Sequence, residues 1–279
     1  MRRAAILSAA ALAGCTSALP AAAPPPPYGA VSLDYCADQM VLGLLPKNQI
    51  RAVSPEADSD LSFSVPLARG LPRLRPSLED IAALRPRYAV RSYGGSPGID
   101  RQLSALGITV VQLNYVAKLD DIPSEIRRIG LELNAKPRAA RLADGFAATL
   151  ADNRRPATAQ APTLLYATPG DVTTGRDSLV GDLISIAGFQ SVREAPGWGT
   201  LPIEAMVRRP PDAMLRAFFD SRRYQQDRWS SSAHPRLRHL TAKVPTATVP
   251  GSALACGNWL AGDALQQLAD LRRGMDKAP

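Results

Sequence analysis

Histidine is scarce in this chain of 279 residues, and that scarcity excludes one kind of site. The two histidines, His234 and His239, are five positions apart and would lie on different faces of one helix. A zinc site needs three or four histidine, cysteine or carboxylate ligands. A bare-metal site is therefore disfavoured. We expect a capping His-Pro and a surface histidine, and no metal ligands in the chain.

Motifs of the common exported α/β enzymes are also missing. The chain contains no Gly-x-Ser-x-Gly elbow and no phosphate-binding loop. Asp171, Asp177 and Asp182 could form a carboxylate cluster, but such a cluster on one loop without histidine is more typical of turns. Cys256 could be a nucleophile, yet neither histidine lies where it would reach the same cleft. We expect no enzyme and no catalytic residues, and an exported α/β enzyme stays as an alternative.

Long hydrophobic runs are absent after the first residues. The apolar run Ala4–Gly14 follows two arginines and is too short to span a bilayer, which is typical of a secretory signal. We therefore assign 1–27 to a signal peptide and a proline-rich tether. Leu12–Cys15 fits a bacterial lipoprotein signal in which Cys15 is lipidated. The small residues of Ala18–Ala23 offer a rival cleavage site, so anchored and free forms both stay open.

Cysteine is nearly as rare as histidine. If Cys15 is lipidated, Cys36 and Cys256 are left, an even number in an oxidising compartment. A disulfide between these two is the default expectation. The alternative is two free thiols, one of them near a ligand, and only the distance between the two cysteines decides.

Acidic residues are outnumbered, giving a net charge of +8 that arginine mainly carries. An exported basic protein could favour an anionic ligand or an acidic surface. A general bias toward arginine and alanine codons explains the same composition. The arginines are scattered without interleaved aromatic residues, so we expect no binding of nucleic acid.

One sequence unit occurs in both halves of the chain. Pro76–Pro86 and Gly199–Asp212 each read as a short helix with an early glutamate, followed by a turn with proline and a β-type run. These runs are Tyr88–Val90 and Ala213–Leu215. A unit used twice indicates two similar lobes with a cleft between them. The matched glutamates then suggest a clamp that meets a partner.

Strands alternate with short helices in both halves, which predicts parallel sheets covered by helices. The fold class is α/β, with two Rossmann-like lobes joined by a long helix. The predicted domains are an N-terminal lobe over 28–120, a helical connector over 121–158 and a C-terminal lobe over 159–279. Strands are expected at 30–33, 50–54, 88–92, 108–113, 163–167, 213–218 and 245–249, and helices at 40–45, 77–84, 99–106, 179–187, 235–240 and 259–274. The stretches 34–39, 55–76 and 168–178 are predicted to be turns or loops.

The connector is predicted from a helical period. Ile122, Ile126 and Ile129 recur on one face, and a second, longer helix follows Pro137. Helices join two lobes more rigidly than a loop does, so we expect limited hinge motion. The alternative is that these are ordinary surface helices of one continuous domain.

Taken in order, several phrases of the sequence resemble one family over about residues 30–275: the substrate-binding proteins of ABC importers for metal chelates, which bind cobalamin, ferric siderophores or haem. The phrases are Pro76–Pro86, Arg101–Ile108, Asp121–Ile126, Thr174–Leu179, Gly197–Gly199 and Leu201–Asp212. The chain looks most like the cobalamin-binding branch in Arg91–Ile108, Thr174–Leu179 and Trp198–Glu204. The resemblance implies a rigid inter-lobe helix, a periplasmic location and a monomeric protein.

The resemblance also implies a partner, the ABC permease of the inner membrane. In the family, one glutamate on each lobe docks on arginines of that permease, and the matching residues are Glu79 and Glu204. Two exposed carboxylates a lobe apart would provide orientation and a faster electrostatic association. Alternatively, each is an acid favoured at a helix N-terminus.

A ligand site is expected beyond the carboxyl ends of the strands, as in other open α/β sheets. The aromatic residues near such positions are Tyr35, Tyr93, Tyr115, Tyr166, Trp198 and Trp259. The resemblance marks Trp198 as a ligand-stacking residue and places an aromatic at Tyr93. Packing in the core or in loops is the alternative for each. Arg91, Arg176 and Arg75 could face an anionic chelate or be solvated.

The ligand itself is expected to be a non-covalently held metal chelate: a corrinoid, a ferric siderophore or haem. The loop 55–76 contains Phe63 but no tyrosine or tryptophan, a departure from the cobalamin binders. Haem held by a tyrosine is the alternative, with Tyr35, Tyr93 or Tyr115 as candidate ligands of its iron. A further alternative is a scaffold or sensor of the same fold that no longer binds a ligand.

Overall fold

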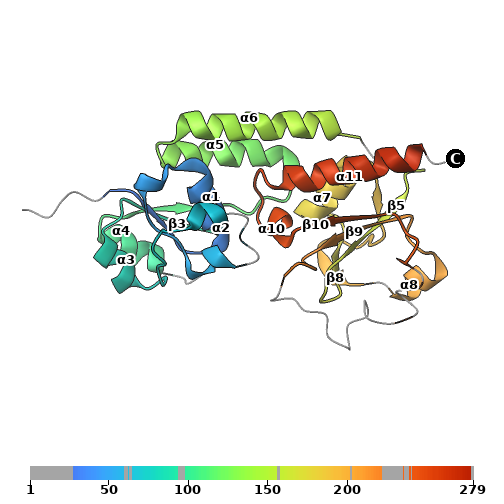
Figure 1. Cartoon of the computed structure of the whole chain (residues 1–279), viewed down its shortest axis with the longest axis horizontal. Coiled ribbons are helices and arrows are strands. Elements are labelled where there is room, and N and C mark those ends of the chain that lie inside the picture. Colours follow the sequence, from blue (N-terminus) through green and yellow to red (C-terminus); the bar gives the residue numbers. More distant parts are fainter. Residues whose placement is uncertain are drawn as a thin grey trace, which may run out of the picture.

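The computed structural model describes residues 28–59, 62, 65–93, 98–155, 158–201, 203–221, 235, 239 and 241–277. These residues form two α/β lobes, side by side in Figure 1, each with its own sheet. The α/β fold class predicted from the sequence is confirmed. In the described part of the chain, none of the helices combines the length and the apolar character that crossing a membrane requires.

The N-terminal lobe contains a four-stranded parallel sheet in the order β2-β1-β3-β4. Its strands are β1 (Ala30–Ser32), β2 (Ile50–Ala52), β3 (Tyr88–Arg91) and β4 (Thr109–Gln112). Its helices are α1 (Tyr35–Leu44), α2 (Val65–Ala68), α3 (Leu78–Leu84) and α4 (Ile99–Ala105), with short 3₁₀ turns η1 (Lys47–Gln49) and η2 (Pro55–Asp58). The chain reverses direction across the sheet between β1 and β3, which makes this the switch point where open sheets bind ligands.

The C-terminal lobe repeats this arrangement with the order β10-β9-β5-β7, again all parallel. Its strands are β5 (Thr163–Ala167), β7 (Gln190–Ser191), β9 (Ala213–Ala217) and β10 (Thr246–Val249). Its helices are α7 (Leu179–Ile186), α8 (Ile203–Arg208), α10 (Gly251–Leu254) and α11 (Ala261–Asp276). The equivalent switch point lies between β5 and β9.

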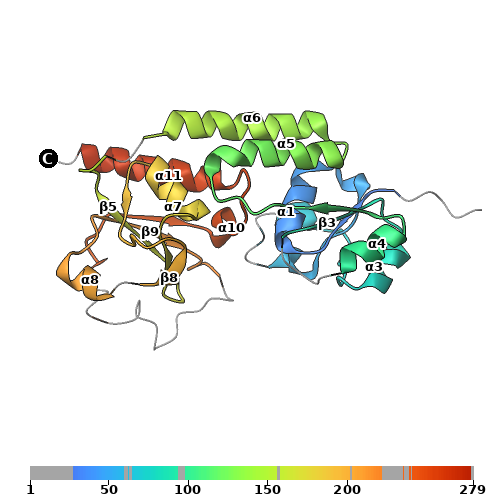
Figure 2. The ribbon, with the colours of Figure 1, turned by 180° about the vertical axis from the view of Figure 1, so that it is seen from behind.

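A helical connector of α5 (Ile122–Glu132) and α6 (Lys136–Asn153) follows η3 (Leu119–Asp121). The two helices run side by side along one side of both lobes, and α11 lies beside them on the C-terminal lobe (Figures 1 and 2). The apolar face predicted for α5 is buried: Ile122, Ile126 and Ile129 are all fully shielded from solvent.

One hydrophobic core extends through both lobes and the connector. It joins Leu44 of α1, Ile126 of α5, Leu150 of α6 and Leu265 of α11 in one cluster of buried residues. Two smaller clusters cover the other faces of the sheets, one around Ile81 and one around Leu165 and Met206. Because the main core is shared, opening the lobes widely would expose apolar surface to water.

The structure corrects the sequence analysis at several places. The predicted loop 55–76 contains the 3₁₀ turn η2 and the short helix α2. The predicted turn at 34–39 is mostly helix, because the Asp34 carboxylate accepts a hydrogen bond from the backbone N–H of Ala37 at 2.9 Å and caps α1 there. The predicted loop 168–178 contains strand β6 (Val172–Thr174), which pairs antiparallel with β8 (Trp198–Thr200). Strands of three residues are too short to show an alternating pattern.

Several predictions fall outside the described residues. These are the leader with Cys15, the aromatic residue Phe63, the glycine-rich turn at 94–97, His234, and most of the segments 220–232 and 235–240. For these the sequence-based expectations stay as stated above.

Candidate functional site: the interface between the lobes

The carboxyl ends of the two sheets face each other across the lobe interface. Cys36 follows β1 in the first turn of α1, and Cys256 follows β10 and α10. Their sulfurs are bonded at 2.02 Å, with Cα atoms 5.6 Å apart, although 220 positions separate them in sequence. The disulfide therefore fixes the ends of the two sheets against one another. This is where the ligand rule for open sheets expects a site.

Other buried contacts surround this disulfide. The Asn258 side-chain amide donates to the Gln39 amide oxygen at 2.5 Å, and Gln39 in turn donates to the backbone oxygen of Ser252 at 3.4 Å. The Trp259 ring lies so close to Gly43 that a Cβ there would be 2.2 Å from it. We call Cys36, Gln39, Gly43, Cys256, Asn258 and Trp259 the seam. Its members come from both lobes and are largely shielded from water.

A small pocket lies between the lobes next to the seam, with room for about one water molecule. Residues of the first lobe and of α5 line one part of it, and residues that follow α10 line the rest. The lining residues are Cys36, Met40, Ser92, Tyr93, Leu113, Asn114, Glu125, Cys256, Gly257 and Asn258.

Two tyrosines stand beyond the carboxyl ends of β3 and β4. The Tyr93 and Tyr115 rings meet edge to face with centroids 5.1 Å apart, and each side chain is 50% exposed. Partial burial, with a smaller effect of Tyr115, raises the pKa of the Tyr93 hydroxyl above its usual range. The phenol is therefore neutral at physiological pH. Tyr93 borders the inter-lobe pocket, and the half-exposed rings of both tyrosines are open to solvent beside it.

A buried carboxylate holds the chain segment that leads to Tyr115. Glu125 of α5 accepts hydrogen bonds from the backbone N–H of Asn114 at 2.8 Å and from its amide at 3.0 Å. It also pairs with Arg128 at 2.6 Å. Burial alone would raise the pKa of Glu125, but Arg128 and Asn114 together outweigh burial and lower it. Glu125 is therefore an anion that positions the end of β4.

A second aromatic pair belongs to the C-terminal lobe. Trp198 in β8 is 54% exposed, and its ring meets that of Tyr166 in β5 at 6.2 Å between centroids. Figures 1 and 2 show β8 on the side of this lobe away from the helical connector. Tyr166 itself is buried, and among the described residues its hydroxyl has no hydrogen-bond partner. Burial raises the pKa of that hydroxyl, so the Tyr166 phenol is neutral. The Tyr166 ring packs against the Trp198 ring from inside the lobe.

The structure does not support three of the predicted ligand contacts. Trp259 packs against Gly43 in the seam, so its large apolar ring serves the lobe contact. Arg91 is 7% exposed and pairs with Asp100 at 2.6 Å, which neutralises the cation that was expected to face an anionic chelate. Tyr166 is buried rather than open to a ligand.

Three other predicted residues lie at or near the surface. Tyr35 opens α1 next to Cys36 and is half-buried. Arg176 and Arg75 are exposed, and Arg176 donates to the backbone oxygen of Glu194 at 3.3 Å. Their contact with a ligand stays a prediction.

The two glutamates of the duplicated unit are both exposed in the first turn of a helix. Glu79 lies in α3, whose N-cap Ser77 accepts a hydrogen bond from the backbone N–H of Asp80 at 3.1 Å. Glu204 lies in α8 of the other lobe. Each position suits an acid at a helix N-terminus and is open to a partner.

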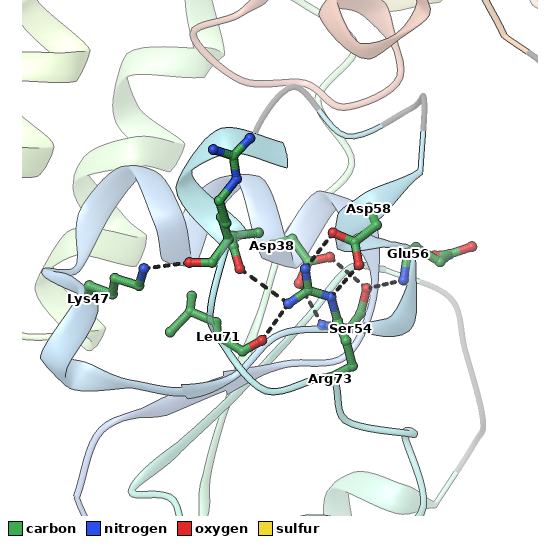
Figure 3. A network of polar contacts seen from close by, with 9 residues as sticks. Asp38, Lys47, Ser54, Glu56, Asp58, Leu71 and Arg73 are labelled. Carbon is green, nitrogen blue, oxygen red and sulfur yellow. Dashed lines mark hydrogen bonds and ion pairs between the residues drawn. The ribbon is translucent and has the colours of Figure 1, made fainter.

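The segment 55–76, predicted to be a functional loop, is anchored to its lobe by Arg73 (Figure 3). The Arg73 guanidinium makes a forked pair with Asp58, at 2.7 and 2.5 Å, and donates to the backbone oxygen of Leu71 at 2.7 Å. The hydrogen bond from Arg73 lowers the pKa of Asp58. The sequence analysis missed Arg73, because its acid partner is fifteen residues away along the chain.

A buried carboxylate next to this anchor ties the start of the segment to α1. Asp38 accepts hydrogen bonds from the Ser54 backbone N–H at 2.8 Å and hydroxyl at 2.6 Å, and also from the Ser32 hydroxyl. Burial raises the pKa of Asp38, and the serine hydrogen bonds partly offset that rise. Within the described residues, no three histidine, cysteine or acidic side chains gather as a metal site would require.

Sequence reasoning also missed Arg216. It is the fourth residue of β9, as Arg91 is of β3. Both strands follow the duplicated helix-and-proline unit, so counting along the unit in each half would have found the second arginine.

Comparison with known proteins now identifies the class. The family described as Periplasmic binding protein matches residues 31–242, and the chain belongs to it. Comparison with the curated proteins gave no match. Members of this family are solute-binding proteins rather than enzymes, so the chain is a periplasmic binding protein of the ABC-importer type. Family membership implies delivery of a small-molecule ligand to an importer permease and a periplasmic location.

Solved structures share the fold at low sequence identity. The heme-binding protein HutB of Vibrio cholerae has a TM-score of 0.69 at 19% identity, covering 89% of this chain and 98% of HutB. The heme-binding protein BhuT, solved with two hemes, has a TM-score of 0.68 at 17% identity, covering 88% of this chain and 99% of BhuT. RhuT from Roseiflexus sp. RS-1, also heme-binding, has a TM-score of 0.65 at 19% identity over 88% of this chain and 97% of RhuT.

Proposed function

We propose that this protein captures a planar iron chelate, with haem as the first candidate, and delivers it to the permease of an ABC importer. The supporting observation is the half-exposed pair of Tyr93 and Tyr115 at the carboxyl ends of neighbouring strands. A tyrosine oxygen is an established axial ligand of haem iron. Trp198 offers a flat ring on the opposite lobe, and stacking on it would add about 0.5–1.5 kcal/mol beyond burial.

Corrinoids and ferric siderophores, the ligands that the sequence resemblance favoured, are the second candidates. They also bind through aromatic contact and need no tyrosine oxygen. Haem moves ahead because two tyrosines with accessible rings meet beyond the carboxyl ends of β3 and β4, and β3 borders the switch point of its sheet. The heme-binding proteins among the similar structures share the fold and raise the same candidate.

Delivery is proposed to use Glu79 and Glu204, one exposed carboxylate from each lobe. We also propose that 28–120 and 159–279 act as the two halves of the receptor, with 121–158 as the connector between them. Export is part of the same proposal. After export, Cys15 is either lipidated as the new N-terminus or removed together with the leader.

Titration of the mature chain with hemin, followed by absorbance, tests the function. We expect saturable binding and an iron–phenolate absorbance band that Tyr93→Phe or Tyr115→Phe abolishes. The raised pKa of Tyr93 means that coordination releases its proton, so affinity for hemin should rise with pH. Trp198→Ala should weaken binding about 2- to 10-fold without removing the band.

Cobinamide and a ferric catechol siderophore are the comparison probes. Saturable quenching of tryptophan fluorescence by either one, without binding of hemin, would transfer the proposal to that ligand class. Binding of hemin with an unchanged spectrum in both tyrosine variants would contradict iron ligation by this pair.

A further inference from the structure

The strand that ends each duplicated unit carries an arginine at the same position, and the two arginines have different partners. Arg91 of β3 and Arg216 of β9 are each the fourth residue of their strand. Both strands lie next to the switch point of their sheet: β3 pairs with β1, and β9 pairs with β5, with Arg216 opposite Ala167. Charged groups near a switch point lie where ligands of open sheets bind.

Acids near Arg216 in the sequence are already engaged elsewhere. The Asp212 carboxylate accepts hydrogen bonds from the backbone N–H and hydroxyl of Thr163, each at 2.8 Å. The Asp220 carboxylate accepts from the backbone N–H of Gly251 at 3.2 Å. No carboxylate in the described part of the chain pairs with Arg216, whereas Asp100 pairs with Arg91 at 2.6 Å. Arg216 is therefore a half-buried cation that has no acidic partner among the described residues.

The Arg216 guanidinium is nevertheless held in place. Its central carbon lies 4.0 Å from the centroid of the Phe219 ring. Stacking uses the flat face of a guanidinium and leaves the N–H donors along its edge available for a carboxylate or phosphate. Phe219 reaches this position because the chain turns at Phe218, whose φ of 67° is uncommon for an aromatic residue. Strained backbone of this kind is concentrated at functional sites.

We propose that Arg216 binds a carboxylate of the ligand, so that the ligand is an anionic chelate held between the lobes. This inference rests on the proposed function and specifies its ligand class. The tyrosine pair of the first lobe would contact the chelate, and Arg216 would bind its acidic edge from the second lobe. Among planar iron chelates, haem with its two propionates fits this arrangement, and a cationic corrinoid does not.

The test compares wild type with Arg216→Gln, using hemin and hemin dimethyl ester as probes. A charge-assisted pair contributes about 1.5–3 kcal/mol, so Arg216→Gln should weaken hemin binding about 10- to 100-fold. Binding of the ester, which has no free carboxylate, should be unchanged. The hemin affinity of Arg216→Lys should fall between those of wild type and Arg216→Gln, because lysine keeps the charge but lacks the planar, forked donor group of arginine. Arg138→Gln on α6 removes an exposed charge elsewhere and serves as the matched control.

Urea unfolding of each variant checks that it is folded. Equal affinity of Arg216→Gln and wild type for hemin would overturn the role of Arg216 and leave haem capture standing. The reverse outcome is also distinguishable. If hemin does not bind but ferric citrate binds in a manner that depends on Arg216, haem capture is overturned and the anion site at Arg216 is supported. Binding of only the ester or of cobinamide, or of none of these probes, would overturn the proposal for Arg216.

Discussion

The lobe interface has a closed side and an open side, and the two differ in their contacts. In the seam, a disulfide, a buried amide pair and a tryptophan packed on a glycine join the lobes through groups that already have partners. On the open side, Tyr93, Tyr115 and Trp198 are half-exposed, and each ring meets an aromatic ring of its own lobe. The seam therefore holds the lobes together, whereas the residues of the open side are available to contact a ligand.

The difference bears on how the protein captures its ligand. A core shared by both lobes and a covalent bond between their sheet ends leave little freedom for domain closure. We therefore expect ligand capture to depend on rotations of exposed side chains rather than on a hinge. Four predictions, taken from the largest effect to the smallest, test this division.

Breaking the disulfide should have the largest effect on stability. Replacing Cys36 and Cys256 together with serine should lower the free energy of unfolding by about 2–5 kcal/mol, because the bond closes a very long loop of the unfolded chain. Urea unfolding of wild type and variant measures the change, and a reductant should affect only wild type. If reduction leaves the midpoint unaltered, the seam is held by its non-covalent contacts alone.

Filling the seam should have the next largest effect. Gly43→Ala places a methyl group 2.2 Å from the rigid Trp259 ring, so we expect a loss of about 1–3 kcal/mol from overpacking. Gly145→Ala is the matched control in another helix, because nothing lies within 4 Å of its added Cβ. It should stabilise the protein by about 0.5–1 kcal/mol. Thermal melts that rank the two variants in the opposite order would contradict the tight contact.

Neutralising Glu125 should destabilise the protein in a pH-dependent manner. The pKa of Glu125 is lowered in the folded state, so its contribution is present above the ordinary value and is lost as the pH falls through the lowered one. Glu125→Gln should therefore cost about 1–3 kcal/mol at neutral pH, and the difference from wild type should shrink in acid. Glu132→Gln, which removes the more exposed partner of Arg128, should change stability by less than about 0.5 kcal/mol.

Changes on the open side should affect binding and barely affect stability. Trp198→Ala should leave the free energy of unfolding within about 0.5 kcal/mol of wild type, since its ring is 54% exposed. The same variant should weaken hemin binding, as proposed above. A large loss of stability in this variant would show that Trp198 belongs to the structural core and would erase the contrast between the two sides.

Most of the fold could be predicted from local patterns. The isoleucine period of α5 and the apolar runs of β5 and β9 place these elements where the structure has them. The short pair of β6 and β8 could not be predicted, because its hydrogen bonds join segments far apart in the sequence. Asp34 could have shown that α1 begins early, since an aspartate before an apolar helix is a capping signal.

The candidate site was less predictable for the same reason: its contacts depend on spatial neighbours that the sequence does not reveal. Tyr93, Tyr115 and Trp198 were found from the rule for strand ends and from the family resemblance, and their contact with a ligand stays a prediction. Arg91 and Trp259 were assigned to the ligand because Asp100 and Gly43, their partners, could not be read as neighbours. Arg216 was missed, although the duplicated unit gave it the same position as Arg91.

The sequence by itself determined the signal-like leader, two lobes of alternating strands and helices, and the helical connector. It also predicts an aromatic rather than a histidine-based ligand site. The leader, the lobes and the connector follow from composition and from short-range periodicity, which act along the chain. The tertiary structure alone decided that Cys36 meets Cys256 and that Trp259 joins the lobes. It also decided that Arg91 pairs with an acid, whereas Arg216 has no acidic partner among the described residues. Each of these depends on which distant groups are brought within a few ångströms, because burial, pairing and charge compensation are set by neighbours in space.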